Sequence, residues 1–213
     1  MLLGVAAALV IAAAVLVGGH VLGRNSSRPQ ATGNAAAATT SSPSASPSPH
    51  SAATPARSAT APPGVAAVRL TAARSAAASV LALINRARAA AGLPAYRLLS
   101  GLDVSAGKHD QLMASGCGLS HQCPGEPSLG ERETQAGVRW TAAGENIGEG
   151  GPVADTTTAI TLMAVALTQD MLNEKPPNDG HRLNLLSSKF GYVGISVSWA
   201  SNGTVWMTQD FAN

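Results

Sequence analysis

The fold class of this chain is decided by a C-terminal stretch that reads Tyr192-Val-Gly-Ile-Ser-Val-Ser-Trp199, then Asn202-Gly203, then Thr204-Val-Trp-Met-Thr-Gln-Asp-Phe211. Both runs alternate in polarity and are rich in β-branched and aromatic residues, which is typical of half-buried strands. Asn-Gly between two such runs is a strong signal for a two-residue β-hairpin. The sequence therefore predicts an antiparallel pair of strands near its C-terminus.

Helical patterns precede the predicted hairpin. Residues 75–91 carry an apolar stripe, and Arg86 and Arg88 are expected to face outward. Apolar residues recur at three- and four-residue spacing over residues 155–173, which predicts a long helix. Shorter helices are expected over residues 102–115, over residues 129–135 and in a turn after His181.

Helices that come first and antiparallel strands that come late, without strand–helix–strand alternation, predict an α+β layered domain with a small antiparallel sheet. Because an isolated hairpin is only marginally stable, we expect a third strand. The best candidate for it is the segment from Trp140 to Ile147. The glycine-rich stretch from Gly144 to Gly151 overlaps its end and predicts a loop.

The N-terminal residues 1–23 contain no Lys, Arg, Asp or Glu and are almost entirely apolar. A helix of about 20 such residues is long enough to cross a bilayer. The segment is therefore interpreted as a signal peptide or a membrane anchor. A basic start and an Ala-x-Ala-like cleavage site are both missing, which favours the anchor, and Arg24 and Arg28 after the span favour a cytoplasmic side for the rest of the chain.

Residues 24–65 consist mostly of Ala, Ser, Thr and Pro, and such a segment buries too little apolar surface to fold, so it predicts a disordered linker. Residues 66–213 are long enough for one domain. In that domain eleven Lys and Arg stand against twelve Asp and Glu, which gives a net charge of −1. No cluster of basic residues accompanies the candidate site residues, so nucleic acid is not expected as a partner.

The chain has two cysteines, Cys117 and Cys123, which lie on either side of His121. In an oxidising compartment their pairing is the expected state, and it argues for export and against a cytoplasmic domain. Two alternatives stay open at this point. The cysteines are free thiols, or they bind zinc together with His121, although this second alternative needs a fourth ligand.

Four residues are candidates for a functional site: His121, Glu145, Glu174 and His181. His121 and His181 lie in glycine-flanked turns, and imidazole nitrogens with carboxylate oxygens can bind a divalent metal. Glu145 is expected to have a cationic or metal partner if the residues after it are core, because a buried Glu is rarely unpaired. Glu174 lies at the C-terminal end of the long helix, where the helix dipole disfavours an anion, so His181 or a nearby cation is its expected partner.

Simpler roles compete with the metal site. The histidines could bond nearby carbonyls, and the acids could accept hydrogen bonds from loop N–H groups. His109 falls inside the helix predicted over residues 102–115 and is interpreted as a helix-surface or packing residue.

Several ordered motifs within residues 78–213 resemble the CAP superfamily, which comprises cysteine-rich secretory proteins, antigen 5 and pathogenesis-related 1 proteins, and in particular its bacterial SCP-like extracellular domains. The motifs are Leu83-Ile-Asn-Arg-Ala-Arg88, Gly92-Leu-Pro94, Leu119-Ser-His121, Ala143-Gly-Glu-Asn-Ile147, Gly180-His-Arg-Leu-Asn-Leu-Leu186, Val193-Gly-Ile195 and Thr208-Gln-Asp-Phe211. The pair Cys117 and Cys123 around the first histidine departs from the common bacterial pattern.

The resemblance implies a three-layer α-β-α sandwich whose cleft is lined by His121, His181, Glu145 and Glu174 and can bind zinc or another divalent cation. It implies an exported protein, secreted or anchored to the outer face of the cytoplasmic membrane, that binds an extracellular or cell-envelope ligand, lipids included. The alternative function is a metal-dependent hydrolase acting on peptides through the same four residues. A third hypothesis is a metal-free hydrogen-bond network that stiffens the loops, so whether the protein is an enzyme is left undecided by the sequence.

Overall fold

The structure is a computed structural model that describes residues 8–17 and 63–213. The remainder of the predicted leader and nearly all of the predicted linker lie outside the described residues. The described elements, in chain order, are β1 (Ala8–Val17), α1 (Pro63–Ala90), β2 (Arg97–Leu98), α2 (Ser100–Leu112), a π-helical turn (Met113–Cys117), α3 (Leu129–Gln135), β3 (Ala142–Gly151), α4 (Thr157–Asn173), α5 (Gly180–Leu185), β4 (Tyr192–Trp199) and β5 (Val205–Ala212).

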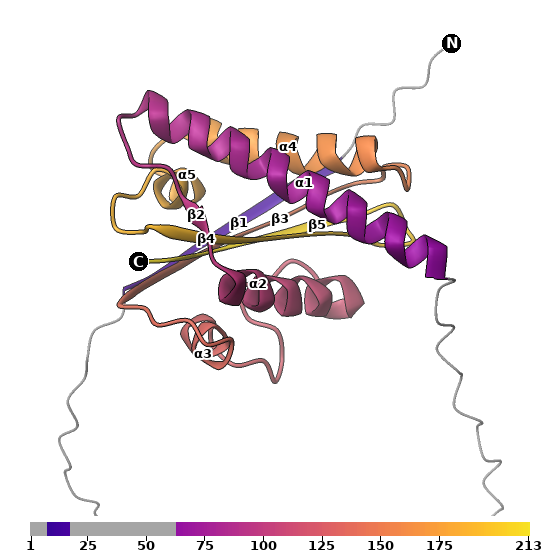
Figure 1. Cartoon of the computed structure of the whole chain (residues 1–213), viewed down its shortest axis with the longest axis horizontal. Helices are drawn as coiled ribbons and strands as arrows, with labels where there is room; N and C mark the ends of the chain where they lie inside the picture. The colour runs from indigo at the N-terminus through magenta and orange to yellow at the C-terminus, as the bar shows by residue number, and fades with distance from the viewer. Residues whose placement is uncertain (1–7, 18–62) are drawn as a thin grey trace, which may run out of the picture. The chain divides into compact units, whose positions relative to one another are not determined.

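The strands form one sheet in the order β1-β3-β5-β4-β2, antiparallel except where β2 runs parallel to β4. The helices lie on both of its faces: α1, α4 and α5 cover one face, and α2 and α3 cover the other (Figure 1). The α+β class and the three-layer α-β-α arrangement are therefore confirmed.

The C-terminal hairpin is confirmed, but its turn is longer than predicted. Trp199 pairs with Val205, so five residues from Ala200 to Thr204 connect the two strands. The Asn202 side chain accepts a hydrogen bond from the N–H of Thr204, and Gly203 has a φ of 88°. Asn-Gly therefore lies in the turn of the hairpin as predicted, but within a longer loop.

The third strand is also confirmed as β3, whereas the prediction of a loop over residues 144–151 is wrong. The glycines are needed here for close packing on an extended strand. A Cβ on Gly144 would lie 2.9 Å from a ring atom of Phe190, and one on Gly148 would lie 3.3 Å from Cε of Met171. Small residues therefore let the helical layer approach the strand, which is a role of strand glycines that a single sequence does not reveal.

Helix α1 begins at Pro63, earlier than predicted, and buries Ala72, Ala76, Val80 and Ile84 along one side. Proline suits the first turn of a helix because its missing N–H has no partner there in any case. Residues 67–90 are long and apolar enough to cross a membrane by length and composition. The four buried residues belong to the core shared with α4, as in the core helix of a soluble domain.

Arg88 was predicted to face outward, and this prediction is wrong, because its residue is only 1% exposed. Its guanidinium lies 3.5 Å from the ring centre of Tyr96 and donates to the carbonyls of Pro94, Leu185 and Ser187. Those carbonyls satisfy a buried charge that would otherwise be costly. The contacts also fix the C-terminal end of α5, the helix that carries His181.

Residues 8–17 lie within the predicted signal peptide or anchor, and the structure places them as β1 along the outer edge of β3. The leader interpretation stays a prediction. The same residues cannot pair with β3 and cross a bilayer as a helix at the same time, so the strand and the anchor are alternative states of one segment.

A substitution at Gly194 tests the packing of α2 on the sheet. A Cβ at Gly194 would lie 2.1 Å from the carbonyl carbon of Leu102 and 2.3 Å from the N of Asp103, both backbone atoms. We expect Gly194→Ala to destabilise the domain by about 1–3 kcal/mol or more, and the melting temperature falls by about 2–4 °C for each kcal/mol. Thermal unfolding followed by circular dichroism measures this.

The matched control is Gly191→Ala, because a Cβ at Gly191 meets nothing within 4 Å. Equal melting temperatures for the two variants would contradict the observed contact between β4 and α2.

Candidate functional site

Glu145 of β3 is completely buried, and its carboxylate has cationic or potentially cationic neighbours on several sides. Arg132 Nη2 lies 2.6 Å from Oε2, His121 Nδ1 lies 2.8 Å from Oε1, and His109 Nε2 lies 3.8 Å from Oε2. Burial alone would raise the pKa of Glu145, but the bond from His121 and the charge of Arg132 outweigh burial and hold this pKa below its ordinary value. The predicted cationic partner therefore exists, and it is Arg132.

His121 is held by the Cys117–Cys123 disulfide, which the structure forms as predicted. The π-helical turn ends at Gly118, and the loop after it presents His121 to Glu145 with its side chain 25% exposed. Because both sulfurs are bonded to each other, the free-thiol and cysteine–zinc alternatives do not apply to this structure. The bridge closes the short loop that carries His121 and limits the motion of this loop.

Glu174 and His181 form a second pair. Glu174 is the C-cap of α4, and its carboxylate accepts from the backbone N–H groups of His181, at 3.0 Å, and of Arg182, at 3.2 Å, while it also bonds His181 Nδ1. An anion is favourable at these free N–H groups of the first turn of α5. This explains why a carboxylate comes directly after α4, and it fixes the ring of His181, whose side chain is only 6% exposed.

Side-chain amides connect α5 to β3. Asn146 Nδ2 donates to the carbonyl of His181 at 3.3 Å and to Gln209 Oε1 at 3.1 Å. Asn184 Nδ2 donates to Asn146 Oδ1 at 2.9 Å and to the carbonyl of Glu145 at 3.2 Å. All these side chains are buried, so α5 is held in register with β3 by satisfied polar contacts and not by apolar packing alone.

Strand alternation directs the side chains of Glu145 and Asn146 to opposite faces of β3. The Glu145 side chain meets His121 and Arg132 in the α2/α3 layer, whereas the next side chain, Asn146, meets the carbonyl of His181 in α5 on the other face. The structure thus joins the four predicted residues as two pairs, His121–Glu145 and His181–Glu174.

The Nε2 atoms of His121 and His181 share one property. Each is buried and has no hydrogen-bond partner among the described residues, whereas each Nδ1 is bonded to a glutamate. Other buried side-chain atoms of this domain share the property, among them His109 Nε2 and the carboxylate oxygens of Glu133 and Asp210, so the bonded Nδ1 atoms are what distinguish His121 and His181 as candidate ligands.

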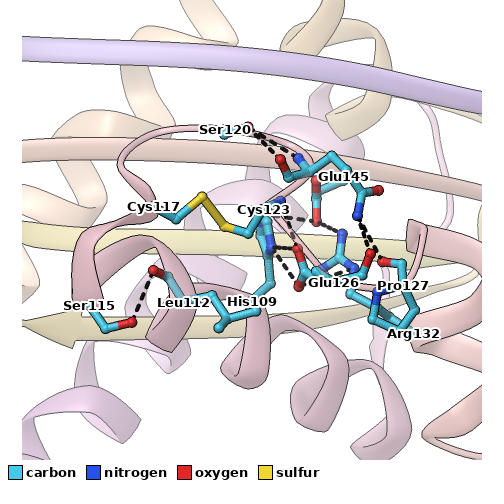
Figure 2. The surroundings of a disulfide bond; sticks show 11 residues. His109, Leu112, Ser115, Cys117, Ser120, Cys123, Glu126, Pro127, Arg132 and Glu145 are labelled. Atoms are coloured by element: carbon cyan, nitrogen blue, oxygen red, sulfur yellow. Dashed lines mark hydrogen bonds and ion pairs between the residues drawn. A yellow bond between two sulfur atoms is a disulfide. The ribbon is translucent and has the colours of Figure 1, made fainter. Parts of the chain in front are cut away.

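Several buried polar residues on the α2/α3 face were not identified from the sequence. His109 was interpreted as a helix-surface or packing residue, but it is 0% exposed and its Nδ1 lies 2.9 Å from both carboxylate oxygens of Glu126. Figure 2 shows His109, Glu126, Arg132 and Glu145 gathered beside the disulfide. The other buried acids near this cluster are Asp110, Glu133 and Asp210.

A sequence signal existed for some of them. Ser128 and Glu131 form a capping box, which marks the start of α3. Arg132 and Glu133 follow Leu129 by three and four residues, so they lie on the same side of this helix as the apolar Leu129. In β5, alternation places Asp210 on the same face as Thr208. No such signal exists for His109, whose helix pattern is ordinary.

The buried acids hold protons more tightly than exposed acids do. Burial, reinforced by the charge of Glu145 and opposed by Arg132, raises the pKa of Glu133 to about 8. Burial, opposed by hydrogen bonds from Ser196 and Thr208, raises the pKa of Asp110 to about 6. Burial and then the charge of Glu145 raise the pKa of Asp210 well above its ordinary value. The negative charge of Glu145 thus helps to raise the pKa of Glu133 and of Asp210, while the pKa of Glu145 itself is lowered.

A group of three residues, His109, Cys123 and Glu126, has potential ligand atoms within 4.8 Å of one another. Cys123 is in the disulfide, however, and a disulfide sulfur is not the thiolate that metals bind. His109 and Glu126 already bond each other. This group therefore has the composition of a metal site but not the chemistry of one while the disulfide is intact.

Two cavities lie outside the His–Glu pairs. One of about 220 Å³ lies between α2 and α3 and includes Lys108, Leu112 and Pro127 in its lining. The other, of about 280 Å³, is lined mainly by apolar groups of α1, α4 and β4, among them Leu70 and Trp199. Neither is lined by a residue of the two pairs.

The fold and site define a class: a three-layer α-β-α domain with a disulfide and two His–Glu pairs. The model of the Cysteine-rich secretory protein family, CAP, matches residues 81–211, and the chain belongs to this family. The resemblance noted in the sequence is thereby confirmed. No curated protein matches the chain.

Two solved structures are similar to this chain. One is an extracellular protein containing an SCP domain from Bacillus anthracis str. Ames, with a TM-score of 0.52 and 26% identity. The matched region covers 66% of this chain and 41% of the Bacillus anthracis chain. A cysteine-rich secretory protein from Staphylococcus aureus has a TM-score of 0.46 and 18% identity, covering 66% of this chain and 38% of its own. The chain thus spans less than half the length of either protein.

Glu133 makes stability depend on pH. Its pKa is 4.5 when unperturbed and about 8 in the folded protein, so the folded state binds more protons between these values. Stability from this group is therefore complete below about pH 4.5 and is lost as the pH rises through about 8, at about 1.4 kcal/mol for each unit of pKa difference. We expect the melting temperature to fall between about pH 4.5 and pH 8, and less steeply in Glu133→Gln.

The control for this measurement is Asp170→Asn, which likewise replaces an acid by its amide, but at an exposed position on α4. It should leave the pH dependence of the wild type unchanged. If Glu133→Gln unfolds with the full wild-type pH slope, the raised pKa of Glu133 is refuted.

Proposed function

We propose that this protein is an exported CAP-domain binding protein in which Nε2 of His121 and Nε2 of His181 bind one divalent cation, with zinc as the first candidate. The cation completes a cleft beside β3 that receives an extracellular or cell-envelope ligand. The observation that supports this most is the pair of buried, unpartnered Nε2 atoms.

The orientation of both histidines supports metal binding. A metal-ligating histidine almost always donates its other ring N–H to a carboxylate or carbonyl, which fixes the tautomer and leaves a lone pair for the metal. His121 donates Nδ1–H to Glu145, and His181 donates to Glu174. Neutral imidazole nitrogens suit zinc and other borderline cations.

The glutamates hold the histidines in this proposal and are not themselves ligands. Glu145 already bonds Arg132, and Glu174 already accepts two backbone N–H groups. Moving either carboxylate to a metal would leave buried donors without an acceptor. This refines the four-ligand site that the sequence predicts to two ligands and two residues that orient them.

Binding is favoured over hydrolysis for the same reason. A bound cation would supply a Lewis acid that polarises an oxygen atom or activates water. A hydrolase also needs a base that is free to accept a proton, and the same bonds engage both glutamates. The residues of the pairs are therefore arranged to hold a cation and a ligand.

The extracellular location is part of the proposal. The Cys117–Cys123 disulfide is expected in an oxidising compartment, and the Bacillus anthracis protein is described as extracellular. The apolar residues 1–23 would direct export or keep the protein on the outer face of the membrane.

Isothermal titration of the purified full chain with zinc tests the proposal. We expect His121→Ala and His181→Ala each to lose high-affinity binding, because each removes one ligand atom. Glu174→Gln should keep one site per chain but weaken it about 10–100-fold, because a residue that orients a ligand contributes less than the ligand itself.

The control is His50→Ala, which removes a histidine of the predicted linker by the same chemical change. It should bind zinc as the wild type does. Equal zinc affinity in the wild type, His121→Ala and His181→Ala would rule the site out, and complete loss in Glu174→Gln would make Glu174 a ligand.

A further inference from the structure

We propose that the outer edge of β3 is a strand-acceptor site, which binds an extended peptide strand of small and branched apolar residues antiparallel to β3. Residues 8–17 of the chain occupy this edge in the structure. A strand supplied by another polypeptide takes their place when the N-terminal segment is elsewhere. The inference rests on the proposed function only in treating the His–Glu pairs as the ligand cleft.

The pairing of β1 shows what the edge accepts. All ten residues of β3, from Ala142 to Gly151, pair with β1 in a continuous antiparallel register, with Val17 opposite Ala142 and Ala8 opposite Gly151. The other edge of β3 is paired with β5. Without β1, the outer edge of β3 would therefore present a ten-residue row of backbone N–H and C=O groups.

Part of the usual protection against pairing is missing from this edge. Natural edge strands are typically short or carry charges, prolines or bulges that discourage a second strand. β3 carries Glu145 and Glu149 but no Lys and no Pro, and Pro152 comes directly after its last residue. Because strands that join an open edge are held mainly by backbone hydrogen bonds, such an edge is suited to binding a peptide.

Two helices, α4 and α5, lie against this edge. Helix α5, which begins beside His181, contacts both β1 and β3, and α4 contacts both strands as well. Figure 1 shows β1, in indigo, running alongside β3 below these helices. A strand in this position therefore lies along β3 and in contact with both helices.

The edge runs past the candidate site. Ala14 pairs with Glu145 and Ala13 pairs with Asn146, the two residues whose side chains meet His121 on one face and α5 on the other. A bound strand would therefore run past Glu145 and Asn146. An extended polypeptide is therefore the ligand class that fits this edge.

The composition of both strands defines the partner further. Six of the ten residues of β3 are Gly or Ala, and β1 reads Ala-Leu-Val-Ile-Ala-Ala-Ala-Val-Leu-Val without a charge. Small residues on β3 allow a neighbouring strand to approach closely. An apolar strand rich in Ala and Val is the partner that matches this edge.

Self-occupancy by β1 lowers the affinity for an added strand, because the apparent dissociation constant rises as the fraction of open edges falls. The double variant Ala12→Pro/Ala13→Pro removes adjacent N–H groups from β1, so at least one ladder bond is lost whichever of them faces β3. The probe is a fluorescent peptide with the sequence of residues 8–17, flanked by lysines for solubility.

Fluorescence anisotropy with the full chain in chelator-containing buffer measures peptide binding without metal. We expect the double variant to bind the peptide about tenfold more tightly than the wild type, or better. A control peptide that carries prolines at the positions of Ala12 and Ala13 should bind weakly to both. Equal dissociation constants for wild type and variant, or equal binding of the two peptides, overturns the proposal.

A second measurement does not depend on the variant. A peptide with a photoreactive benzoyl-phenylalanine at the position of Ala14, used in excess with the wild type, should cross-link to the segment around Glu145. Cross-links confined to other elements overturn the proposal. Since zinc is absent, failure here leaves the zinc site standing, and failure of the zinc titration leaves the strand site standing.

Discussion

The site depends on one buried charge, the carboxylate of Glu145. Moving a carboxylate out of water costs several kcal/mol even after the protein relaxes, so the fold must supply partners. Arg132 reaches it from α3, His121 reaches it from the disulfide loop, and the amide of Asn184 in α5 bonds the carbonyl of the same residue. Three segments that are distant in sequence are therefore tied to β3 at one residue. The raised pKa values of Glu133 and Asp210 serve the same end, because they disfavour a second negative charge beside Glu145.

Much of this architecture can be predicted from local sequence rules. Alternation and Asn-Gly predicted the β4–β5 hairpin, and the apolar periodicity predicted α4, because both signals are decided by neighbours a few residues apart. The β3 strand was predicted only in part. Its glycines are read as loop residues by local rules, whereas in the fold they make room for Phe190 and Met171, which lie far away in sequence. A strand selected for close approach cannot be distinguished from a loop without knowing what approaches it.

The site shows the same division. His121, Glu145, Glu174 and His181 were identified because glycine-flanked turns and a carboxylate at a helix end are locally unusual, and the structure does join them as His–Glu pairs. His109 was missed because it lies in an ordinary helical pattern, and Arg132 was missed although it lies on the same side of α3 as Leu129. Their roles come from burial beside an acid on another element, a three-dimensional property. Arg88 is the clearest case, since its apparent place on the outer side of α1 conceals a charge that Tyr96 and three carbonyls enclose.

The N-terminal segment connects the location of the protein to the state of its cleft. Leu, Ile and Val each gain about 0.3–0.6 kcal/mol at the centre of a membrane-spanning helix, so a run such as residues 8–17 favours the bilayer whenever one is available. In the structure the same run has backbone partners along β3. Because one segment cannot be both a strand of the sheet and a membrane-spanning helix, insertion of residues 8–17 into a membrane would separate β1 from β3. The proposed strand-acceptor edge beside Glu145 and Asn146 would then be open, without any change in the residues of the site itself.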